Sequence, residues 1–233
     1  MKAFLLAAGE GTRLRPLTDS IPKCLVPIRR ESLLEIWLQQ CARSGITEVL
    51  INLHSHADAV RSFVASRDFG VQIRLFDEPV LLGSAGTISA NRAWVQADPY
   101  FWIMYADVLT NMNLSGMLRA HREQNIAATL GIYQAPNPSQ CGIVELDDGS
   151  IIQSFEEKPL DPKSGLAFSG VMIATPEFLH EVPSAVPADI GLHVLPKLVG
   201  RMRAYVSQEY LVDIGTPEKY EKAQHTWPGL SAW

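Results

Sequence analysis

The sequence predicts an α/β fold built on a doubly wound, mostly parallel sheet, followed by a small β-rich lid. Three observations predict it: short apolar runs alternate with helical patterns in the first half, these runs contain few charges, and hairpin signals appear only later. Strands buried on both faces have this continuous apolar character. Ligands of such sheets bind at the carboxyl ends of the strands.

The first half of the chain supplies the strands and helices of this sheet. Its short apolar runs predict strands at Lys2–Ala7, Glu48–Leu53, Gln72–Phe76, Phe101–Tyr105 and Ala127–Ile132. Helical patterns between them predict helices at Leu33–Arg43, Ala57–Ser66, Ala85–Ala97 and Leu114–Glu123. Because the two kinds of element alternate, we expect parallel pairing through right-handed crossovers.

The second half of the chain has a different pattern. Strands are predicted at Gly142–Leu146, Ile151–Phe155 and Gly165–Ala174, and helices near Pro176–His180 and Asp189–Gly200. Asp147-Asp148-Gly149, between the first two of these strands, is a hairpin signal. Thr216 is expected to cap the last helix, with Pro217 at its first position. Since no linker or repeat interrupts the sequence, one domain over residues 1–233 is expected, with no second catalytic domain after its short tail.

Composition and charge exclude several classes of protein. The net charge of −5 and the pI near 5.7 give no basic footprint for nucleic acid or an anionic membrane. No apolar run approaches the roughly 18 residues of a membrane span, and the N-terminus is expected to be a strand, not a signal peptide. Cys24, Cys41 and Cys141 form no C-x-x-C pair, which favours free thiols in a reducing cytoplasm. His54 and His56 follow a predicted strand, which favours a strand-to-helix turn over a metal pair.

The most informative stretch is residues 5–27, LLAAGEGTRLRPLTDSIPKCLVP. Gly9 and Gly11 let the backbone approach a ligand closely, with several N–H groups facing one point. Arg13 and Lys23 add two cations, so the segment predicts a polyphosphate site. A Walker A loop is excluded because no Lys follows Gly11, and a dinucleotide fingerprint is excluded because Leu14 stands in place of its third glycine.

This stretch resembles the signature of the sugar-1-phosphate nucleotidylyltransferases, L-A-(A/G)-G-x-G-T-R-L-x-P-L-T followed by P-K-P. The chain departs from it at Cys24, where the family usually has proline. The resemblance implies the Rossmann-like nucleotide-diphospho-sugar transferase fold, with a nucleotide-binding half over residues 1–135 and a sugar-binding lid half over residues 136–233. The nucleotide-binding residues that it implies are Leu6, Ala7, Ala8, Gly9, Gly11, Thr12, Arg13, Lys23, Gly83 and Ser84.

Two carboxylates far apart in the sequence are candidates for a metal site. Asp107 follows the apolar strand FWIMYA, and Asp213 lies in LVDIGTPEKY. The resemblance implies that both aspartates bind a divalent cation, Mg²⁺ or Mn²⁺, and that Arg13, Lys23, Asp107 and Asp213 are the catalytic residues. Arg13 would hold the leaving pyrophosphate bidentately and Lys23 the α-phosphate. Mg²⁺ prefers carboxylate and phosphate oxygens and lowers the repulsion between two anionic substrates.

A second cationic motif, Phe155-Glu156-Glu157-Lys158-Pro159, resembles the F-x-E-K-P of the family. There the Glu contacts sugar hydroxyls and the Lys contacts the sugar phosphate. A solvated surface turn is the alternative interpretation of the same residues. The sugar-phosphate-binding residues that the resemblance implies are Ala106, Gly142, Glu157, Lys158, Ser169 and Gly170. Ala106 stands where the family often has Gly, and Phe168-Ser169-Gly170 stands where it usually has N-A-G. These departures leave the identity of the sugar open.

The segment Leu82–Thr87, after Glu78, resembles the family's E-x-x-x-L-G-(T/S)-A-G loop, whose backbone groups read the edge of the base. A glycine-rich turn in which Ser84 caps the next helix describes the same residues. This sequence pattern is commoner in guanylyl-type members of the family. GTP is therefore favoured, with UTP or dTTP as the alternative.

The resemblance implies a complete reaction. An NTP and a hexose or manno-heptose 1-phosphate give an NDP-sugar and pyrophosphate by direct attack on the α-phosphorus. We expect these two substrates as partners, no nucleic acid or membrane, and a monomer or a homodimer. A nicotinamide-dependent oxidoreductase would need a third glycine and an acidic ribose ligand. A non-catalytic nucleotide-sugar-binding protein would lose the metal carboxylates, whereas Asp107 and Asp213 are both present.

Overall fold

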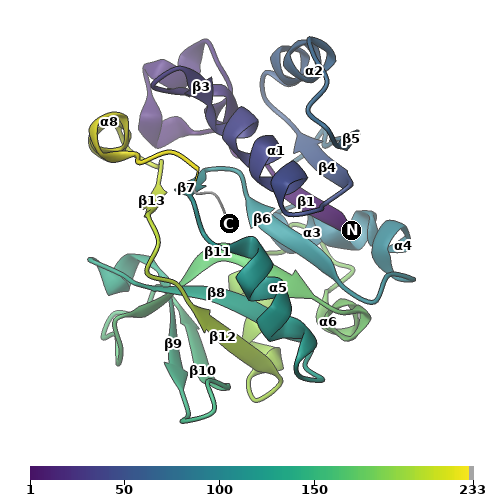
Figure 1. The fold of residues 1–233 in the computed structure, drawn as a ribbon, viewed down its shortest axis with the longest axis vertical. Coiled ribbons are helices and arrows are strands. Elements are labelled where there is room, and N and C mark those ends of the chain that lie inside the picture. The colour runs from purple at the N-terminus through teal and green to yellow at the C-terminus, as the bar shows by residue number, and fades with distance from the viewer. Residues whose placement is uncertain (231–233) are drawn as a thin grey trace. The chain divides into compact units, whose positions relative to one another are not determined.

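The computed structural model describes residues 1–230, which form two compact units. Unit 1 consists of Met1–Leu81, Met104–Asn113 and the described residues from 209 to 230, and unit 2 consists of Leu82–Ile103 and Leu114–Gln208. The boundary between them falls inside strand β6 (Phe101–Tyr105). Strands and helices alternate through most of the first half of the chain, and four strands follow one another between residues 128 and 174, so the predicted α/β class with helices flanking a mostly parallel sheet is confirmed (Figure 1). Every helix in the described part of the chain is too short or too polar to cross a membrane.

Unit 1 is built on three parallel strands in the order β1 (Lys2–Leu6), β4 (Glu48–Leu53) and β5 (Gln72–Asp77). Their apolar runs are buried through β1 and β4, as expected for strands covered on both faces. Helix α1 (Leu33–Arg43) follows its N-cap Ser32, whose hydroxyl accepts from the Glu35 N–H at 3.1 Å.

Shorter elements complete unit 1. The loop after β1 contains three 3₁₀ turns, η1 (Thr12–Leu14), η2 (Leu17–Asp19) and η3 (Lys23–Leu25), and leads to the short strands β2 (Pro27–Ile28) and β3 (Glu31–Ser32). Helix α2 (Ala57–Ala65) connects β4 to β5. Strands β7 (Val108–Thr110) and β13 (Leu211–Asp213) pair antiparallel, and helix α8 (Pro217–Thr226) follows β13. The predicted cap of this helix is confirmed, because the Thr216 hydroxyl accepts from the Lys219 N–H.

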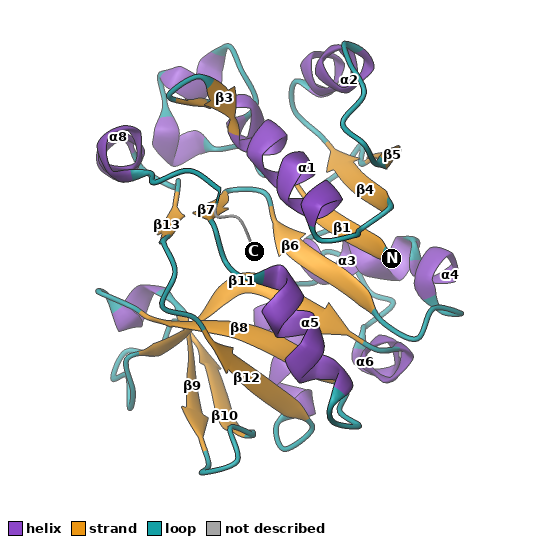
Figure 2. Ribbon diagram, in the orientation of Figure 1, coloured by secondary structure: helices purple, strands orange, loops and turns teal. Residues whose placement is uncertain are grey.

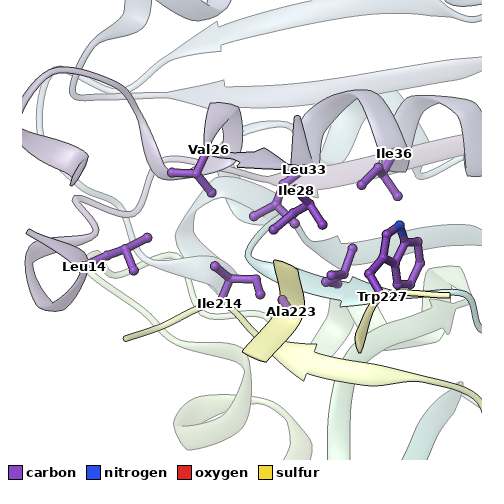
Figure 3. Packing of buried hydrophobic residues seen from close by; sticks show 9 residues of the cluster. Leu14, Val26, Ile28, Leu33, Ile36, Ile214, Ala223 and Trp227 are labelled. Atoms are coloured by element: carbon purple, nitrogen blue, oxygen red, sulfur yellow. The ribbon is translucent and has the colours of Figure 1, made fainter. Parts of the chain in front are cut away.

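A hydrophobic cluster joins the start and the end of the chain within unit 1 (Figure 3). Leu14 follows the glycine loop, Ile214 follows β13, and Trp227 ends α8; all three are buried. The other buried members are Val26, Ile28, Leu33, Ile36, Leu109 and Ala223. Burying a large apolar side chain contributes roughly 1.5–3 kcal/mol, so this cluster fixes the glycine loop and the Asp213 segment in one framework.

Unit 2 contains a mixed sheet in which β10 (Ile152–Glu157), β9 (Gly142–Leu146), β11 (Leu166–Ala174) and β6 are neighbours in that order. Strand β8 (Ala128–Gln134) pairs antiparallel with β11 and parallel with β12 (Met202–Val206), and helix α5 (Leu114–Arg122) contacts β8 and β12 (Figure 2). The predicted hairpin between β9 and β10 is confirmed. Its turn is held by Asp147, whose carboxylate accepts from the N–H groups of Gly149 and Ile151.

Two predicted helices are each interrupted. The predicted helix Ala85–Ala97 is two short helices, α3 (Ser84–Ala90) and α4 (Arg92–Val95), because the Asn91 side chain bonds the Thr87 carbonyl at 3.0 Å and ends the first. The predicted helix Asp189–Gly200 is α7 (Ile190–His193) followed by the 3₁₀ turn η5 (Leu195–Leu198). Pro196 lacks an N–H and cannot continue a helix, which explains the second break. Helix α6 (Pro176–Glu181) agrees with its prediction.

Candidate functional site

Buried polar side chains of unit 1 hold the start of the glycine loop. The Ala7 N–H donates to Asn52 Oδ1 at 2.7 Å, and Asn52 Nδ2 donates to Glu78 Oε1 at 2.9 Å. Asn52 and Glu78 are 4% and 2% exposed, so the bonds are shielded from water. A ring nitrogen of His54 lies 2.7 Å from the Glu78 carbonyl oxygen, and His56 is the N-cap residue of α2. Both histidines therefore belong to the predicted strand-to-helix turn.

Gly11 shapes the rest of the loop. Its φ of 66° lies in the left-handed region, and its carbonyl accepts from the Thr18 hydroxyl at 2.8 Å. A Cβ on Gly11 would lie 3.0 Å from Thr18 Cγ2 and 3.2 Å from Lys23 Cβ, so a side chain there would displace Lys23 or Thr18. Gly9, by contrast, is exposed, and a Cβ there would meet no described heavy atom within 4 Å. The loop thus presents open backbone beside a fixed lysine.

The β7–β13 pair brings the two candidate carboxylates together within unit 1. Asp213 pairs with Val108 in the strand register, and the Ile214 N–H donates to the Asp107 carbonyl at 2.8 Å. The Ala106 N–H donates to the Leu6 carbonyl at 3.0 Å, which fixes this turn beside the end of β1. Two aspartates that are 106 positions apart in the sequence thus lie at the same end of the β7–β13 pair.

Lys23 lies between these carboxylates. Its Nζ donates to Asp107 Oδ2 at 2.6 Å and lies 3.8 Å from Asp213 Oδ1. The Lys23 side chain is 10% exposed, whereas those of Asp107 and Asp213 are 37% and 36% exposed. One buried ammonium therefore marks the point on which both half-exposed carboxylates converge.

Two further cations complete this group in unit 1. Lys219 Nζ donates to Asp213 Oδ2 at 3.0 Å from the first turn of α8. A Cβ on Gly215 would lie 2.9 Å from Asp213 Oδ2 and 3.3 Å from Arg13 Nη2, so Gly215 leaves room for the exposed Arg13 guanidinium. Three cations with two carboxylates leave one positive charge, which suits an anionic ligand.

The donor set of this group fits a hard divalent cation. The two carboxylates of Asp107 and Asp213 already share one cationic partner, and Mg²⁺ prefers such oxygen ligands. Within residues 1–230 no group of three or more His, Cys, Asp or Glu side chains could hold a metal. A cation held by these two aspartates would therefore take its remaining ligands from water and phosphate, as Mg²⁺ commonly does.

Cys24 stands beside Lys23 but is not a nucleophile. Its thiol is 2% exposed, and burial raises its pKa to about 12. Nucleophilic cysteines have lowered pKa values, because the thiolate is the reactive form. The departure from the proline of the family signature at Cys24 therefore adds an inert buried side chain.

The predicted sugar-phosphate residues other than Ala106 lie in unit 2. Glu157 is the last residue of β10, and its carboxylate lies close to two glycines. A Cβ would lie 2.8 Å from Glu157 Oε2 if placed on Gly142 and 2.6 Å from it if placed on Gly191. Burial raises the pKa of the Glu157 carboxyl, and the Lys158 ammonium 3.6 Å away opposes this shift. Lys158 itself is 66% exposed and has a φ of 51°. Left-handed backbone at a residue other than glycine costs about 1 kcal/mol, and such strain is found at functional sites.

Ser169 and Gly170 lie at an irregularity in β11. The pairing of β11 with β8 shifts between Phe168 and Met172, and Gly170 has a φ of 79°. The buried Ser169 hydroxyl accepts from the Val171 N–H at 3.2 Å. A bulge of this kind redirects the backbone of a strand, which explains why glycine follows Ser169.

The predicted base-contacting residues Gly83 and Ser84 also lie in unit 2. Gly83, with a φ of 77°, is the N-cap residue of α3, and Ser84 is its first residue. The interpretation that Ser84 caps this helix is therefore wrong. The Ser84 hydroxyl instead donates to Asp189 Oδ2 at 2.9 Å.

The structure brings some predicted residues together and adds others. Arg13, Lys23, Asp107 and Asp213 form one group in unit 1, and Glu157, Lys158 and Gly142 form another in unit 2. Four residues of these groups were not predicted from the sequence: Asn52, Asp189, Gly191 and Lys219. Lys219 had a signal, because a lysine in the first turn of a helix opposes the helix dipole. Asn52 also had one, since it is a polar residue inside the apolar run of β4.

Together, the parallel α/β framework, the glycine loop after β1 and the mixed-charge group define a protein class suited to binding phosphorylated ligands. The family model described as "Nucleotidyl transferase" matches residues 2–228. The chain therefore belongs to the nucleotidyl transferase family.

Curated relatives carry names of the same kind. The chain is 32% identical to a UTP–glucose-1-phosphate uridylyltransferase of Synechocystis, covering 96% of this chain and 62% of the relative. It is 29% identical to the mannose-1-phosphate guanyltransferase beta-A of Xenopus laevis, covering 94% of this chain and 62% of that protein. The chain thus spans 62% of the length of either relative.

Solved structures share the fold over almost the whole chain. A protein described as a glucose-1-phosphate thymidylyltransferase from Bacillus anthracis superposes with a TM-score of 0.88 at 20% identity, covering 100% of this chain and 97% of its own. A UDP-glucose pyrophosphorylase complexed with UDP-glucose superposes with a TM-score of 0.84 at 21% identity, covering 97% of both chains. The Rossmann-like nucleotide-diphospho-sugar transferase fold that the sequence predicts is confirmed.

Proposed function

We propose that this protein transfers a nucleoside monophosphate from an NTP to a sugar 1-phosphate, giving an NDP-sugar and pyrophosphate. The observation that carries the proposal is the Lys23 ammonium between Asp107 and Asp213, beside the open glycine loop. A triphosphate needs several cations and N–H donors, and a second anionic substrate needs further neutralisation. The names of the relatives support the same reaction class.

The reaction is a single in-line displacement. An oxygen of the sugar phosphate forms a bond to the α-phosphorus, while the bond from the α-phosphorus to the bridging oxygen breaks and pyrophosphate leaves with that oxygen. A phosphate oxygen is already anionic, so it requires no general base. The protein contributes position and charge, as in other phosphoryl-type transfers.

Each cation of unit 1 has a separate part in this proposal. The exposed Arg13 guanidinium binds the departing pyrophosphate through its planar donors. Lys23 exchanges its bond to Asp107 for one to the α-phosphate, which frees Asp107 and leaves Asp213 paired with Lys219. Asp107 and Asp213 would then hold Mg²⁺ or Mn²⁺. When bound, this cation supplies charge neutralisation between the nucleotide and sugar phosphates.

The sugar phosphate is assigned to residues of unit 2, together with Ala106. Glu157 accepts from sugar hydroxyls, and the exposed Lys158 binds the sugar phosphate as a point charge. Gly142, Ser169 and Gly170 supply backbone near the sugar. The proposal thus assigns the nucleotide mainly to residues 1–135 and the sugar phosphate mainly to residues 136–233, with Ala106 and Asp213 as exceptions.

GTP is the proposed donor, and UTP or dTTP is the alternative. The support for GTP is the sequence pattern of the Leu82–Thr87 segment and its glycine-rich backbone. The relatives include both a uridylyltransferase and a guanyltransferase, so both bases belong in the test. A site built for one base leaves buried groups unpaired with another, at about 1–3 kcal/mol per group.

A panel of NTPs against glucose, mannose and manno-heptose 1-phosphates tests the proposal. The measurement is pyrophosphate release with Mg²⁺, and mass spectrometry identifies the nucleotide sugar. We expect release that requires both substrates and favours GTP by tenfold or more, which corresponds to about 1.4 kcal/mol. Preference for UTP or dTTP would overturn the guanylyl assignment alone. Binding of an NDP-sugar without turnover would overturn the transferase proposal. Pyrophosphate release at the same rate with and without the sugar phosphate would also overturn it.

A further inference from the structure

A segment after residue 185 is bonded within unit 2 to Leu82, Gly83 and the first turn of α3, which together are called the Leu82–Gly86 loop below. The Ala188 carbonyl accepts from the N–H groups of Ala85 and Gly86 at 2.9 and 3.2 Å, and the Ala188 N–H donates to the Leu82 carbonyl at 2.8 Å. Ala188 is only 3% exposed, so water does not compete for these bonds. The first N–H groups of α3 are thus satisfied by the chain itself, and the loop conformation depends on this segment.

Asp189 adds a side-chain tether to the same loop. Its Oδ2 accepts from the Ser84 hydroxyl at 2.9 Å, and its Oδ1 accepts from the Leu192 N–H at 3.1 Å. The Ser84 oxygen in turn accepts from the Ile190 N–H at 2.8 Å. Both carboxylate oxygens and the serine hydroxyl are therefore committed, and hydrogen bonds to an ionised group are stronger than neutral ones.

The approach between the two segments is closer than an ordinary side chain allows. A Cβ on Gly83 would lie 2.9 Å from the Ala188 carbonyl carbon and 3.0 Å from its nitrogen. The φ of 77° at Gly83 also favours glycine. Gly83 and Gly86, at the start of α3, lose more conformational freedom on ordering than other residues, so an external constraint stabilises this segment. Ala188 and Asp189 supply it.

The same segment also lies against the carboxylate assigned to the sugar. A Cβ on Gly191 would lie 2.6 Å from Glu157 Oε2 and 3.2 Å from Asp189 Oδ1. Burial raises the pKa of the Glu157 carboxyl, and the Asp189 charge adds to this effect. Asp189 therefore lies near both the Ser84 segment, which is assigned to the base, and Glu157, which is assigned to the sugar.

We infer that Asp189 is a positioning residue that holds the Leu82–Gly86 loop in its base-selecting conformation through Ser84. The inference rests on the proposed function, in which this loop reads the edge of the base. Selection against a wrong base requires hydrogen-bonding groups that cannot move to meet it. Without the tether the loop adapts to either base, so the discrimination between bases falls while turnover persists.

The test compares kcat/KM for GTP, UTP and dTTP in Asp189→Asn, Ser84→Ala and the double variant. We expect the preference of the wild type for its best base to fall about fivefold or more in each single variant, with no further loss in the double variant. Glu145→Gln is the matched control, because Glu145 Oε2 accepts from the Ser154 hydroxyl at 2.7 Å on the exposed β9–β10 hairpin. Its base preference should equal that of the wild type.

A base preference within twofold of the wild-type value in both single variants would overturn the inference, as would a wild type that does not discriminate between bases. If Asp189→Asn does not fold, Ser84→Ala removes the same hydrogen bond and gives the answer. A merely structural role would lower kcat/KM for all bases by one factor, which also overturns the inference.

Hydrogen exchange separates this inference from the proposed function. The Ala85 and Gly86 amides should exchange faster in Asp189→Asn than in wild type or Glu145→Gln, whether or not the protein turns over. A wild type without transfer activity would overturn the proposed function, and with it base selection. Unchanged exchange at these two amides would overturn the tether itself.

Discussion

Replacing Lys23 by methionine tests how the unit 1 charge group prepares for a cation. The Lys23 ammonium lies at the point on which the Asp107 and Asp213 carboxylates converge. A divalent cation bound there before the nucleotide must displace it. Methionine has a similar length and no charge, and the Lys23 side chain is only 10% exposed, so the variant should pack without a large defect. We expect Lys23→Met to bind metal more tightly than wild type when no nucleotide is present.

The size of this effect follows from the contacts. Hydrogen bonds to charged groups contribute about 1.5–3 kcal/mol, but Asp107 is 37% exposed and solvent screens the pair. The lower end of that range, about 1.5 kcal/mol, corresponds to a change of roughly tenfold in the dissociation constant. Lys219 touches Asp213 alone and is 40% exposed, so its removal is worth roughly 0.2–1 kcal/mol. That amounts to at most about fivefold.

Mn²⁺ is the probe, because electron paramagnetic resonance measures the free ion directly during titration of the nucleotide-free protein. The dissociation constant should fall about tenfold in Lys23→Met and less in the matched variant Lys219→Met. Asp107→Asn serves as the negative control and should bind more weakly than wild type. Equal affinities of wild type and Lys23→Met for Mn²⁺ would show that the Lys23 ammonium does not compete with the metal.

Three other predictions concern catalysis and stability. Asp107→Asn or Asp213→Asn should lower turnover by orders of magnitude with an unchanged unfolding transition, and unchanged pyrophosphate release in EDTA would contradict the metal role. Arg13→Ala should mainly lower kcat, whereas Lys158→Ala should mainly raise KM for the sugar phosphate; a wild-type KM in the latter would show that Lys158 does not bind it. Burial lowers the pKa of His121 to about 4, so the unfolded state binds a proton between pH 6.5 and 4 that the folded state does not. The free energy of unfolding should therefore fall by roughly 3 kcal/mol as pH falls through this window, and His121→Gln should lose this slope in urea titrations.

Local patterns were sufficient to predict the main strands and helices. The predicted bounds of Leu33–Arg43, Glu48–Leu53 and Phe101–Tyr105 agree with the structure, because their apolar spacing already marks which faces are buried. The pairing of β7 with β13 was not predicted. Each of these strands has three residues, and their partnership depends on the fold of the intervening chain.

The site residues that are near one another in the sequence could be predicted, and those that are distant in the sequence could not be predicted from local patterns. Gly11, Arg13 and Lys23 lie in one continuous motif, so their proximity could be read from the sequence. That Asp107 and Asp213 lie together was implied only by the resemblance to a family, and the β7–β13 pairing explains it physically.

The residues that were missed act through distant partners. Asn52 contacts the Ala7 N–H, Asp189 contacts Ser84, and Lys219 completes the environment of Asp213. Polar side chains of this kind have no periodic signature. Asn52 stood out inside an apolar run and Lys219 in the first turn of a helix, but the groups that they bond are known only from the folded structure.

Isotope tracing shows whether an oxygen of the sugar phosphate becomes bonded to the α-phosphorus. A sugar 1-phosphate with ¹⁸O in its phosphate oxygens is incubated with the preferred NTP, Mg²⁺ and the protein in ordinary water. Mass spectrometry and ³¹P NMR then locate the label. Direct attack of a sugar phosphate oxygen on the α-phosphorus predicts that the NDP-sugar keeps all of the ¹⁸O, one atom of it in the new bridge, and that pyrophosphate contains none. Label in pyrophosphate or inorganic phosphate, or the absence of a labelled NDP-sugar, would contradict the account.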